Sequence, residues 1–384
     1  MTNKKLKVGN VPNLRFPGFK GEWEMKKLGE IADKITDGTH DTPKPVEEGI
    51  PFLTAIHIKD GFVDYKNCYY LEQEVHNIIY KRCNPEKNDL LIVNIGAGTA
   101  TCALNIVDYE FSLKNVALVK PNKNIIDGIY LAQLQRKNSA KIFNQLTSGG
   151  AQPFLSLKEI GRLLIKFPSL SEQQKIASFL SLVDERIATQ NKIIEELKLL
   201  KNTIRYQLYK QILNGENELV RIKDILNYEQ PTKYLVTNTD YSSDTSLIPV
   251  LTANKAFVLG YTDEGFGVYD KDECIIFDDF TMDMKFVNFR FKVKSSAIKI
   301  LTAKPNMNLK FTFEYLSFLN LSSNEHKRHY ISKIEQMEIA LPDHIRQKQI
   351  AVVLSSIDEK IKIESEIYTL LIKQKQYILA NLFI

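Results

Sequence analysis

The sequence predicts an α/β (α+β) fold in two copies, with each copy followed by a long α-helix. The first observation is a phrase that occurs twice, beginning at Pro168 and at Pro342, with the gapless pattern P-x4-Q-x2-I-A-x2-L-S-x2-D-E-[R/K]-I. The second is a heptad pattern of apolar residues in each copy, which predicts a coiled-coil helix. The third is that the remaining segments share short phrases and strand-like runs. We therefore expect a pseudo-twofold internal repeat whose function is carried out twice.

The repeated phrase divides the chain into four expected segments. They are a first α/β domain at 1–168, a central helix at 169–214, a second α/β domain at 215–342 and a C-terminal helix at 343–384. Residues 50–55 and 248–253 share the pattern I-P-x-L-T-A. Strand-like apolar runs end at Val93 and Phe277 and are bounded by Gly, Asn and Asp. The two domains should therefore share one fold and differ in their loops.

Each long helix is expected to present one apolar seam. The seam positions are Ile176, Leu180, Val183, Ile187, Ile194, Leu197, Ile204 and Leu208, and then Ile350, Leu354, Ile357, Ile361, Tyr368, Leu371, Ile378 and Leu382. Polar residues interrupt the seam at equivalent places, Gln190 with Glu364 and Lys201 with Lys375. About 40 helical residues would form a rod of roughly 60 Å.

The two helices are expected to form an antiparallel hairpin, because the first leads into the second domain and the second leads out of it. The α/β domains would then lie at opposite ends of a coiled-coil spacer. An antiparallel register centred on the seam predicts that Lys201 lies opposite Glu364 and that Gln190 lies near Lys375. Such a buried polar layer can fix the register. The alternative is a coiled coil that serves only self-association.

Composition sets broad limits on the class of protein. The chain has 384 residues, of which 44% are hydrophobic and 25% charged, which suits two soluble domains. No apolar run approaches the roughly 20 residues needed to cross a bilayer, so we expect a cytoplasmic protein. The four cysteines at 68, 83, 102 and 274 have no C-x-x-C spacing, which argues against zinc and disulfides. The net charge of +5 is only a weak indication of nucleic-acid binding.

Familiar catalytic motifs are missing from the sequence. It has no P-loop pattern and no N-P-P-[F/Y] or D-P-P-[F/Y] tetrapeptide of amino-group methyltransferases. Residues 96–100 form a partial glycine-rich loop that we interpret as a turn between strands. The repeated D-E-[R/K] at 184–186 and 358–360 is interpreted as a solvated helix face or an interface. The pair His326 and His329 flanks Lys327 and Arg328, which favours a basic contact loop over a metal site. The chain is therefore expected to bind rather than to catalyse.

The alternation of α/β block and repeated helix resembles the DNA-specificity (S) subunit of type I restriction-modification systems over nearly the whole chain. In the first block, the phrases at 23–31, 37–43 and 150–153 resemble target-recognition domains of this family. In the second block, the phrases at 249–253, 260–262, 277–281 and 293–297 resemble a different type of such domain. One departure is Arg346 in the second copy, where the first has Glu172.

The resemblance implies a function and a set of partners. Each target-recognition domain would read one half of a split, asymmetric site in double-stranded DNA. The helices would set the spacing between the half-sites and dock two methyltransferase subunits, which bind S-adenosylmethionine and modify adenine at N6. Restriction subunits that use ATP and Mg would join them to cleave DNA. The specificity subunit itself would hold no cofactor, no metal and no catalytic residue.

Candidate DNA contacts are hydroxyl, amide and basic side chains in the loops of the two domains. Half-sites on one face of B-DNA lie roughly 34 to 36 Å apart, which the spacer could match. The candidates are Thr36, Thr39, His40, Thr42, Lys44, Ser148 and Gln152 in the first domain, and Thr252, Asn254, Lys255, Tyr261, Thr262, Thr281, Lys285, His326, Lys327, Arg328 and His329 in the second.

Several alternatives stay open from the sequence. The Asp-Gly phrase at 37–38 could be merely a turn. Residues 277–280 could equally be a strand end with two solvated carboxylates. For the whole chain, the alternatives to DNA recognition are a protein-interaction adaptor with paired domains on a coiled-coil spacer, and an enzyme with an unfamiliar site.

Overall fold

The computed structural model describes residues 9–96, 98–147, 153–253, 256–321 and 329–384. Its contacts divide the chain into two compact units. Unit 1 is Met1–Thr189 together with Tyr368–Ile384, and unit 2 is Gln190–Ile367. Each unit therefore combines one α/β block with a stretch of both long helices.

Unit 1 is built on a four-stranded antiparallel sheet in the order β2-β10-β7-β8. A second sheet has the order β6-β3-β9, and β1 pairs with β11. The elements are β1 (Glu24–Lys27), α1 (Leu28–Ile31), β2 (Ala32–Asp37), β3 (Ile50–Thr54), the 3-10 helix Ala55–His57, β4 (Ile58–Lys59), β5 (Phe62–Val63), β6 (Tyr69–Leu71), α2 (Gln73–Arg82), β7 (Leu90–Val93), β8 (Cys102–Leu104), β9 (Ser112–Lys114), β10 (Val116–Pro121), α3 (Gly128–Thr147), α4 (Leu157–Arg162) and β11 (Leu164–Phe167).

Unit 2 repeats these three sheets in the same order, as β13-β19-β16-β17, β15-β14-β18 and β12-β20. In both units the middle strand of the three-stranded sheet has one antiparallel and one parallel neighbour. The elements are β12 (Glu218–Arg221), α6 (Ile222–Ile225), β13 (Leu226–Glu229), the 3-10 helix Pro231–Tyr234, β14 (Ile248–Leu251), β15 (Val258–Thr262), β16 (Cys274–Asp278), β17 (Met284–Val287), β18 (Lys292–Val293), β19 (Ile298–Ala303), α7 (Leu309–Phe318), the π-helix Tyr330–Ile334 and β20 (Glu338–Leu341). The shared strand order confirms the predicted repeat.

The strand-like runs of the sequence are central strands that are buried on both faces. In β7, Leu90 and Ile92 pack on one side with α3, while Leu91 and Val93 pack on the other side with β9 and β10. The side chains of β16 divide in the same way between two clusters. A strand covered on both faces needs apolar residues at every position, which explains the unbroken runs. The four cysteines are buried and free.

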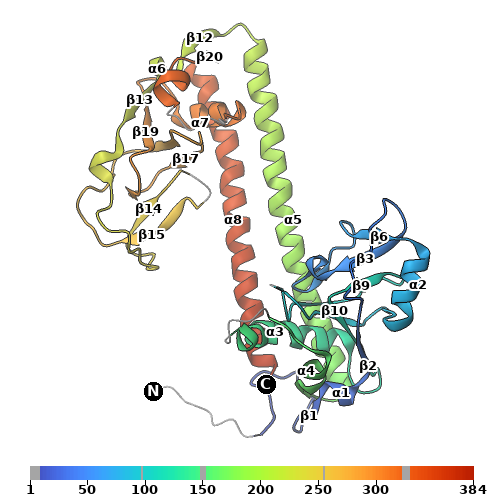
Figure 1. Ribbon diagram of the computed structural model, residues 1–384. Coiled ribbons are helices and arrows are strands. Elements are labelled where there is room, and N and C mark those ends of the chain that lie inside the picture. The colour runs from blue at the N-terminus through green and yellow to red at the C-terminus, as the bar shows by residue number, and fades with distance from the viewer. Residues whose placement is uncertain (1–8, 97, 148–152, 254–255, 322–328) are drawn as a thin grey trace, which may run out of the picture. The chain divides into compact units, whose positions relative to one another are not determined.

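The long helices are α5 (Leu170–Asn214) and α8 (His344–Leu382). In each unit the segments of α5 and α8 lie side by side and run antiparallel (Figure 1). All sixteen predicted seam positions are buried or half-buried, and between them lie many exposed residues. The heptad prediction is therefore confirmed for both helices. None of the helices in the described ranges has an apolar stretch that could span a bilayer.

The glutamine of the repeated phrase ties each helix to its α/β block. The Gln173 amide nitrogen donates to the carbonyls of Pro168 (2.9 Å) and Ile125 (3.0 Å), and its oxygen accepts from the Asp127 N–H (2.9 Å) just before α3. Gln347 repeats this arrangement at the start of α8.

In that second copy, the Gln347 amide donates to the Pro342 carbonyl (2.9 Å) and accepts from the Asn308 N–H (3.1 Å) just before α7. The Ile-Ala pair and the leucine that follow the glutamine are buried in both copies. Glu172 of the first copy is also buried and binds the Arg15 guanidinium at 2.7 and 2.8 Å, whereas Arg346 at the equivalent place is exposed. The departure noted in the sequence thus reflects a contact specific to unit 1.

We predict that Gln173→Ala lowers the free energy of unfolding by about 1–3 kcal/mol, because the Asp127 N–H and the Pro168 carbonyl lose their partner. Urea unfolding followed by circular dichroism measures this. The control is Gln174→Ala, because Gln174 is adjacent and exposed. Equal stability of the two variants would contradict the role given to Gln173.

Candidate nucleic-acid interface

Charged side chains form a polar layer between the helices in each unit. In unit 1, Asp184 on α5 pairs with Lys375 on α8, and it also accepts hydrogen bonds from Gln133 (2.7 Å) and Arg136 (3.1 Å) on α3. In unit 2, Lys201 donates to both oxygens of Asp358 at 2.7 and 2.8 Å. These two pairs are equivalent, because Asp358 and Lys375 lie 174 residues after Asp184 and Lys201.

The predicted register of these layers is wrong. Lys201 does not face Glu364; its partner Asp358 lies six residues earlier on α8. Gln190 donates to the carbonyl (3.0 Å) and the carboxylate of Glu364, its own counterpart 174 residues away, and not to Lys375. The physical reason is charge pairing, since each lysine binds the aspartate of the repeated phrase on the other helix. The D-E-[R/K] phrase therefore supplies an interface residue as well as an exposed one.

The layer in unit 2 contains an additional carboxylate. Glu314 on α7 is fully buried and binds Lys201 (2.8 Å), Lys310 (2.9 Å) and Arg205 (3.5 Å). Gln133 has the equivalent position on α3. It lies six residues after Asp127, whose N–H binds Gln173, as Glu314 lies six residues after Asn308, whose N–H binds Gln347. The extra negative charge in unit 2 is thus matched by extra basic partners, as a buried carboxylate requires.

The Asp-Gly phrase of the first block lies at the end of β2 and is held against β9 and β10. The Gly38 and Thr39 N–H groups donate to the carbonyls of Val116 (3.1 Å) and Leu113 (2.8 Å). A Cβ on Gly38 would lie 1.9 Å from the Leu113 carbonyl oxygen, so only glycine fits. The phrase is more than a free turn, because it docks on the next sheet.

The candidate residues around this phrase fall into two groups. Thr36 is buried, and its hydroxyl donates to the Arg82 carbonyl at 3.3 Å, which is a structural contact. His40 and Thr42 are exposed. His40 lies 2.8 Å from a carboxylate oxygen of Asp37, and the Thr42 hydroxyl accepts from Lys114.

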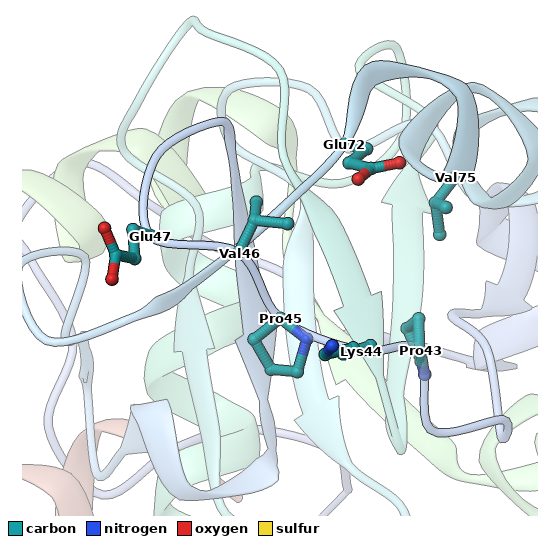
Figure 2. Close-up of a pocket in the computed structure, with 7 residues that line it drawn as sticks. All are labelled: Pro43, Lys44, Pro45, Val46, Glu47, Glu72 and Val75. Carbon is teal, nitrogen blue, oxygen red and sulfur yellow. The ribbon is translucent and has the colours of Figure 1, made fainter.

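Lys44 lines a hollow of about 730 Å³, which Figure 2 shows between the 43–47 loop and the start of α2. Its walls are Pro43, Pro45, Val46 and Val75 with the carboxylates of Glu47 and Glu72. Two carboxylates oppose the single lysine, so the hollow does not have the charge of a phosphate site. Lys44 is itself exposed at its rim.

Most candidates of the second block that are described lie on two sheets or next to their strands. Thr252 follows β14, while Tyr261 and Thr262 lie on the adjacent strand β15. Thr262 is buried, and its hydroxyl accepts from the Glu264 N–H at 3.2 Å. Lys285 lies on β17, the edge strand of the four-stranded sheet, and the Thr281 hydroxyl in the preceding turn donates to Asp283 at 3.1 Å.

The aspartates at 278–279 are buried, which corrects the alternative of two solvated carboxylates. Asp278 accepts from the N–H groups of Phe280 and Thr281, both at 2.9 Å. Asp279 accepts from the N–H groups of His329 (3.1 Å) and Tyr330 (2.8 Å) and lies 3.4 Å from the buried Lys299 ammonium.

His329 is only 1% exposed in this arrangement, so its side chain does not fit a DNA contact at the surface. The candidates Ser148, Gln152, Asn254, Lys255, His326, Lys327 and Arg328 lie outside the described residues. The partial glycine-rich loop is a turn between β7 and β8, as predicted, where the Gly96 carbonyl accepts from the Thr99 N–H (3.0 Å) and hydroxyl (2.6 Å).

Sequence reasoning missed three residues that the fold brings to the Asp-Gly phrase. Arg82 ends α2 and pairs with Asp37, Asn115 lies 3.1 Å from His40, and Lys114 binds Thr42. They lie 45, 75 and 72 residues from these partners, so no local pattern connects them. In the part of the chain that the structure describes, no three His, Cys, Asp or Glu side chains are grouped so that they could hold a metal ion.

Two copies of one α/β unit, each tied to the long helices by the same phrase, define a duplicated module of two related domains. The family model described as "Type I restriction modification DNA specificity domain" matches residues 20–199 and 214–372, and the chain belongs to this family.

Individual relatives agree with this assignment. The chain is 46% identical over 139 residues to the type I restriction enzyme EcoR124I/EcoR124II specificity subunit of Escherichia coli, a match that spans 34% of this chain and 34% of that protein. It is 25% identical over 395 residues to the putative type I restriction enzyme MjaX specificity subunit of Methanocaldococcus jannaschii, which covers 94% of this chain and 91% of the relative.

Solved structures share the fold. The type-I restriction-modification system S subunit from M. genitalium aligns with a TM-score of 0.66 at 14% identity, over 97% of this chain and 99% of that one. A chain from a structural study of complex assembly and conformational transition of the type I restriction-modification system aligns with a TM-score of 0.54 at 15% identity, over 96% of this chain and 98% of that one.

The polar layers make stability depend on pH in a defined direction. Burial raises the pKa of Asp184, but hydrogen bonds from Lys375 and Gln133 outweigh burial and hold the pKa below its ordinary value. A carboxyl whose pKa is lower in the folded state stabilises the fold above its unfolded pKa of about 3.9. This stabilisation is lost as the pH falls through the folded pKa.

We predict that Asp184→Asn lowers the free energy of unfolding by about 1–3 kcal/mol at pH 7, and that the difference from the wild type shrinks below about pH 4. Urea unfolding between pH 7 and pH 3 measures both effects. The matched control is Glu185→Gln, because Glu185 is the exposed neighbour in the same phrase. A difference that stays constant down to pH 3 would show that the charge of Asp184 is not the cause.

Proposed function

We propose that the chain is a DNA-specificity subunit in which each α/β block reads one half of a split, asymmetric DNA site. The observation that carries the proposal is the family match to both halves of the chain, at 20–199 and 214–372. The repeated sheet order supports it, because two copies of one scaffold can present two different sets of loops. The loops of the two blocks have different sequences and would therefore contact different bases. The two half-sites need not be alike.

The helices in this proposal set the spacing between the half-sites and dock two methyltransferase subunits. Exposed apolar residues support the docking role. In unit 2, Leu199, Tyr206 and Leu213 recur at heptad spacing on α5, and in unit 1, Leu370 and Tyr377 do so on α8. Exposed apolar stripes of this kind are typical of surfaces that partner proteins cover. Restriction subunits would complete the complex.

The chain itself would hold no cofactor. S-adenosylmethionine would bind to the methyltransferase subunits, which modify adenine at N6, and ATP with Mg would bind to the restriction subunits. This chain would determine the DNA sequence at which all these partner subunits act. It would act in the cytoplasm.

We predict that cells expressing this chain with its methyltransferase partners acquire adenine-N6 methylation at a split motif. Single-molecule sequencing of genomic DNA measures the methylated positions. The control strain expresses the same methyltransferase subunits without the chain and should lack the motif. Identical methylation in both strains would contradict the proposed function.

We also predict that substitutions in the two blocks relax different halves of the motif. Thr42→Ala in unit 1 should relax one half-site and Tyr261→Ala in unit 2 the other, because each unit carries its own set of loops. Sequencing of methylated DNA from cells that express each variant measures this. Thr189→Ala, at an exposed position of α5, is the control. If both variants relaxed the same half of the motif, the result would contradict the proposal that each block reads its own half-site.

A further inference from the structure

Asp37 is a buried carboxylate at the end of β2 that binds two exposed basic side chains. Its side chain is 6% exposed, and one oxygen pairs with the Arg82 guanidinium while the other lies 2.8 Å from Nε2 of His40. Arg82 and His40 have side chains that are 55% and 46% exposed. A single buried acceptor therefore fixes two side chains, of which the Arg82 guanidinium keeps further N–H donors at the surface.

Both basic residues are also held from other directions. Nδ1 of His40 lies 3.1 Å from the side-chain oxygen of Asn115, in the turn between β9 and β10. The Arg82 carbonyl, at the end of α2, accepts from the Lys34 ammonium (3.0 Å) and the Thr36 hydroxyl (3.3 Å), both on β2. Three elements thus converge on one site.

A guanidinium has five N–H donors, and the Asp37 contact engages only part of them. An arginine held in this way loses less side-chain entropy on binding than a free one. A phosphate oxygen of DNA suits the remaining donors of an exposed arginine, whereas both ring nitrogens of His40 are already engaged by Asp37 and Asn115. Lys114, bound to Thr42, and the Lys34 ammonium add positive charge around the same phrase.

We propose that Asp37 is a positioning residue that holds Arg82 against a phosphate of the DNA backbone at the half-site read by the first block. The proposal rests on the DNA-binding function proposed above. It assigns Arg82 to phosphate contact and not to base reading, and it gives a negatively charged residue a favourable role at a DNA surface.

The opposing explanation is that the pair of Asp37 with Arg82 only fastens α2 to β2. The two explanations differ in the sign of one effect. Asp37→Asn removes a negative charge near DNA, which by simple electrostatics strengthens binding. If Asp37 orients Arg82, the same change weakens binding, because the amide has one acceptor oxygen where the carboxylate has two, one for Arg82 and one for His40.

The experiment uses the full chain assembled with its methyltransferase subunits and a labelled duplex that carries the methylation motif, with a scrambled duplex for comparison. Fluorescence anisotropy over a series of salt concentrations gives the affinity and its salt dependence. The variants are Arg82→Ala, Asp37→Asn, the double variant R82A/H40A, and Asp37→Asn in that double background. Asp41→Asn, an exposed carboxylate of the same loop, and Arg162→Ala, an exposed arginine of unit 1, are the controls.

We expect Arg82→Ala to weaken binding to both duplexes by about ten-fold and to reduce the slope of log K against log salt by about 1. Asp37→Asn should weaken binding as well, and this effect should disappear in the R82A/H40A background. Asp41→Asn should leave binding unchanged or strengthen it, and Arg162→Ala should not alter the salt slope.

Stronger or unchanged binding by Asp37→Asn would overturn the positioning role, and so would an equal effect of that change in the R82A/H40A background. If Asp37→Asn lowers the thermal unfolding midpoint, the proposal is tested by Arg82→Ala alone, because Arg82 is exposed. An unaltered salt slope for Arg82→Ala then overturns the proposal. Failure of the wild-type complex to bind either duplex at low salt would instead contradict the function itself.

Discussion

The attachment of each long helix to its α/β block through one buried glutamine is the contact on which the rest of the structure depends. Gln173 and Gln347 bind the carbonyl of the proline that opens the phrase and the N–H of the residue that precedes α3 or α7. These hydrogen bonds fix where the helix starts relative to its block. Because the start is fixed, every later turn of the helix has a fixed position as well.

The polar layers follow from that fixed start. Eleven residues after the glutamine, which is about three helical turns, Asp184 and Asp358 reach the level of the lysine on the opposite helix and of α3 or α7. Burying such a pair costs desolvation, so the layer is retained for register more than for strength. Unit 2 shows that the arrangement tolerates a different composition, provided that charge stays balanced, since Glu314 is accompanied by Lys310 and Arg205. The two layers share the Asp–Lys pair and differ in the residues that surround it.

Sequence reasoning succeeded where a pattern is local. The heptad seam and the strands of β7 and β16 are periodic or continuous over a few residues, so burial could be predicted from them. The polar register could not be derived in this way, because periodicity shows which residues face the other helix but not how far the helices are displaced along each other. That displacement depends on Gln173 and Gln347, whose partners lie outside the helices. For the same reason Arg82 and Asn115 were missed, while His329 was assigned to the surface although Asp279 draws its backbone into the interior.

The two glutamines bind backbone groups of their blocks, and this allows the amino-acid sequences of the two blocks to differ. Gln173 and Gln347 bind main-chain carbonyl and N–H groups, which are present whatever side chains the block carries. An attachment through side-chain pairs would constrain the residues before α3 and α7, yet these are Asp127 in one unit and Asn308 in the other. Attachment through the backbone separates the geometry of the helices from the sequence of the blocks. The loops that carry Asp37, His40 and their partners in unit 1 can therefore differ from those of unit 2 without altering how either block is held.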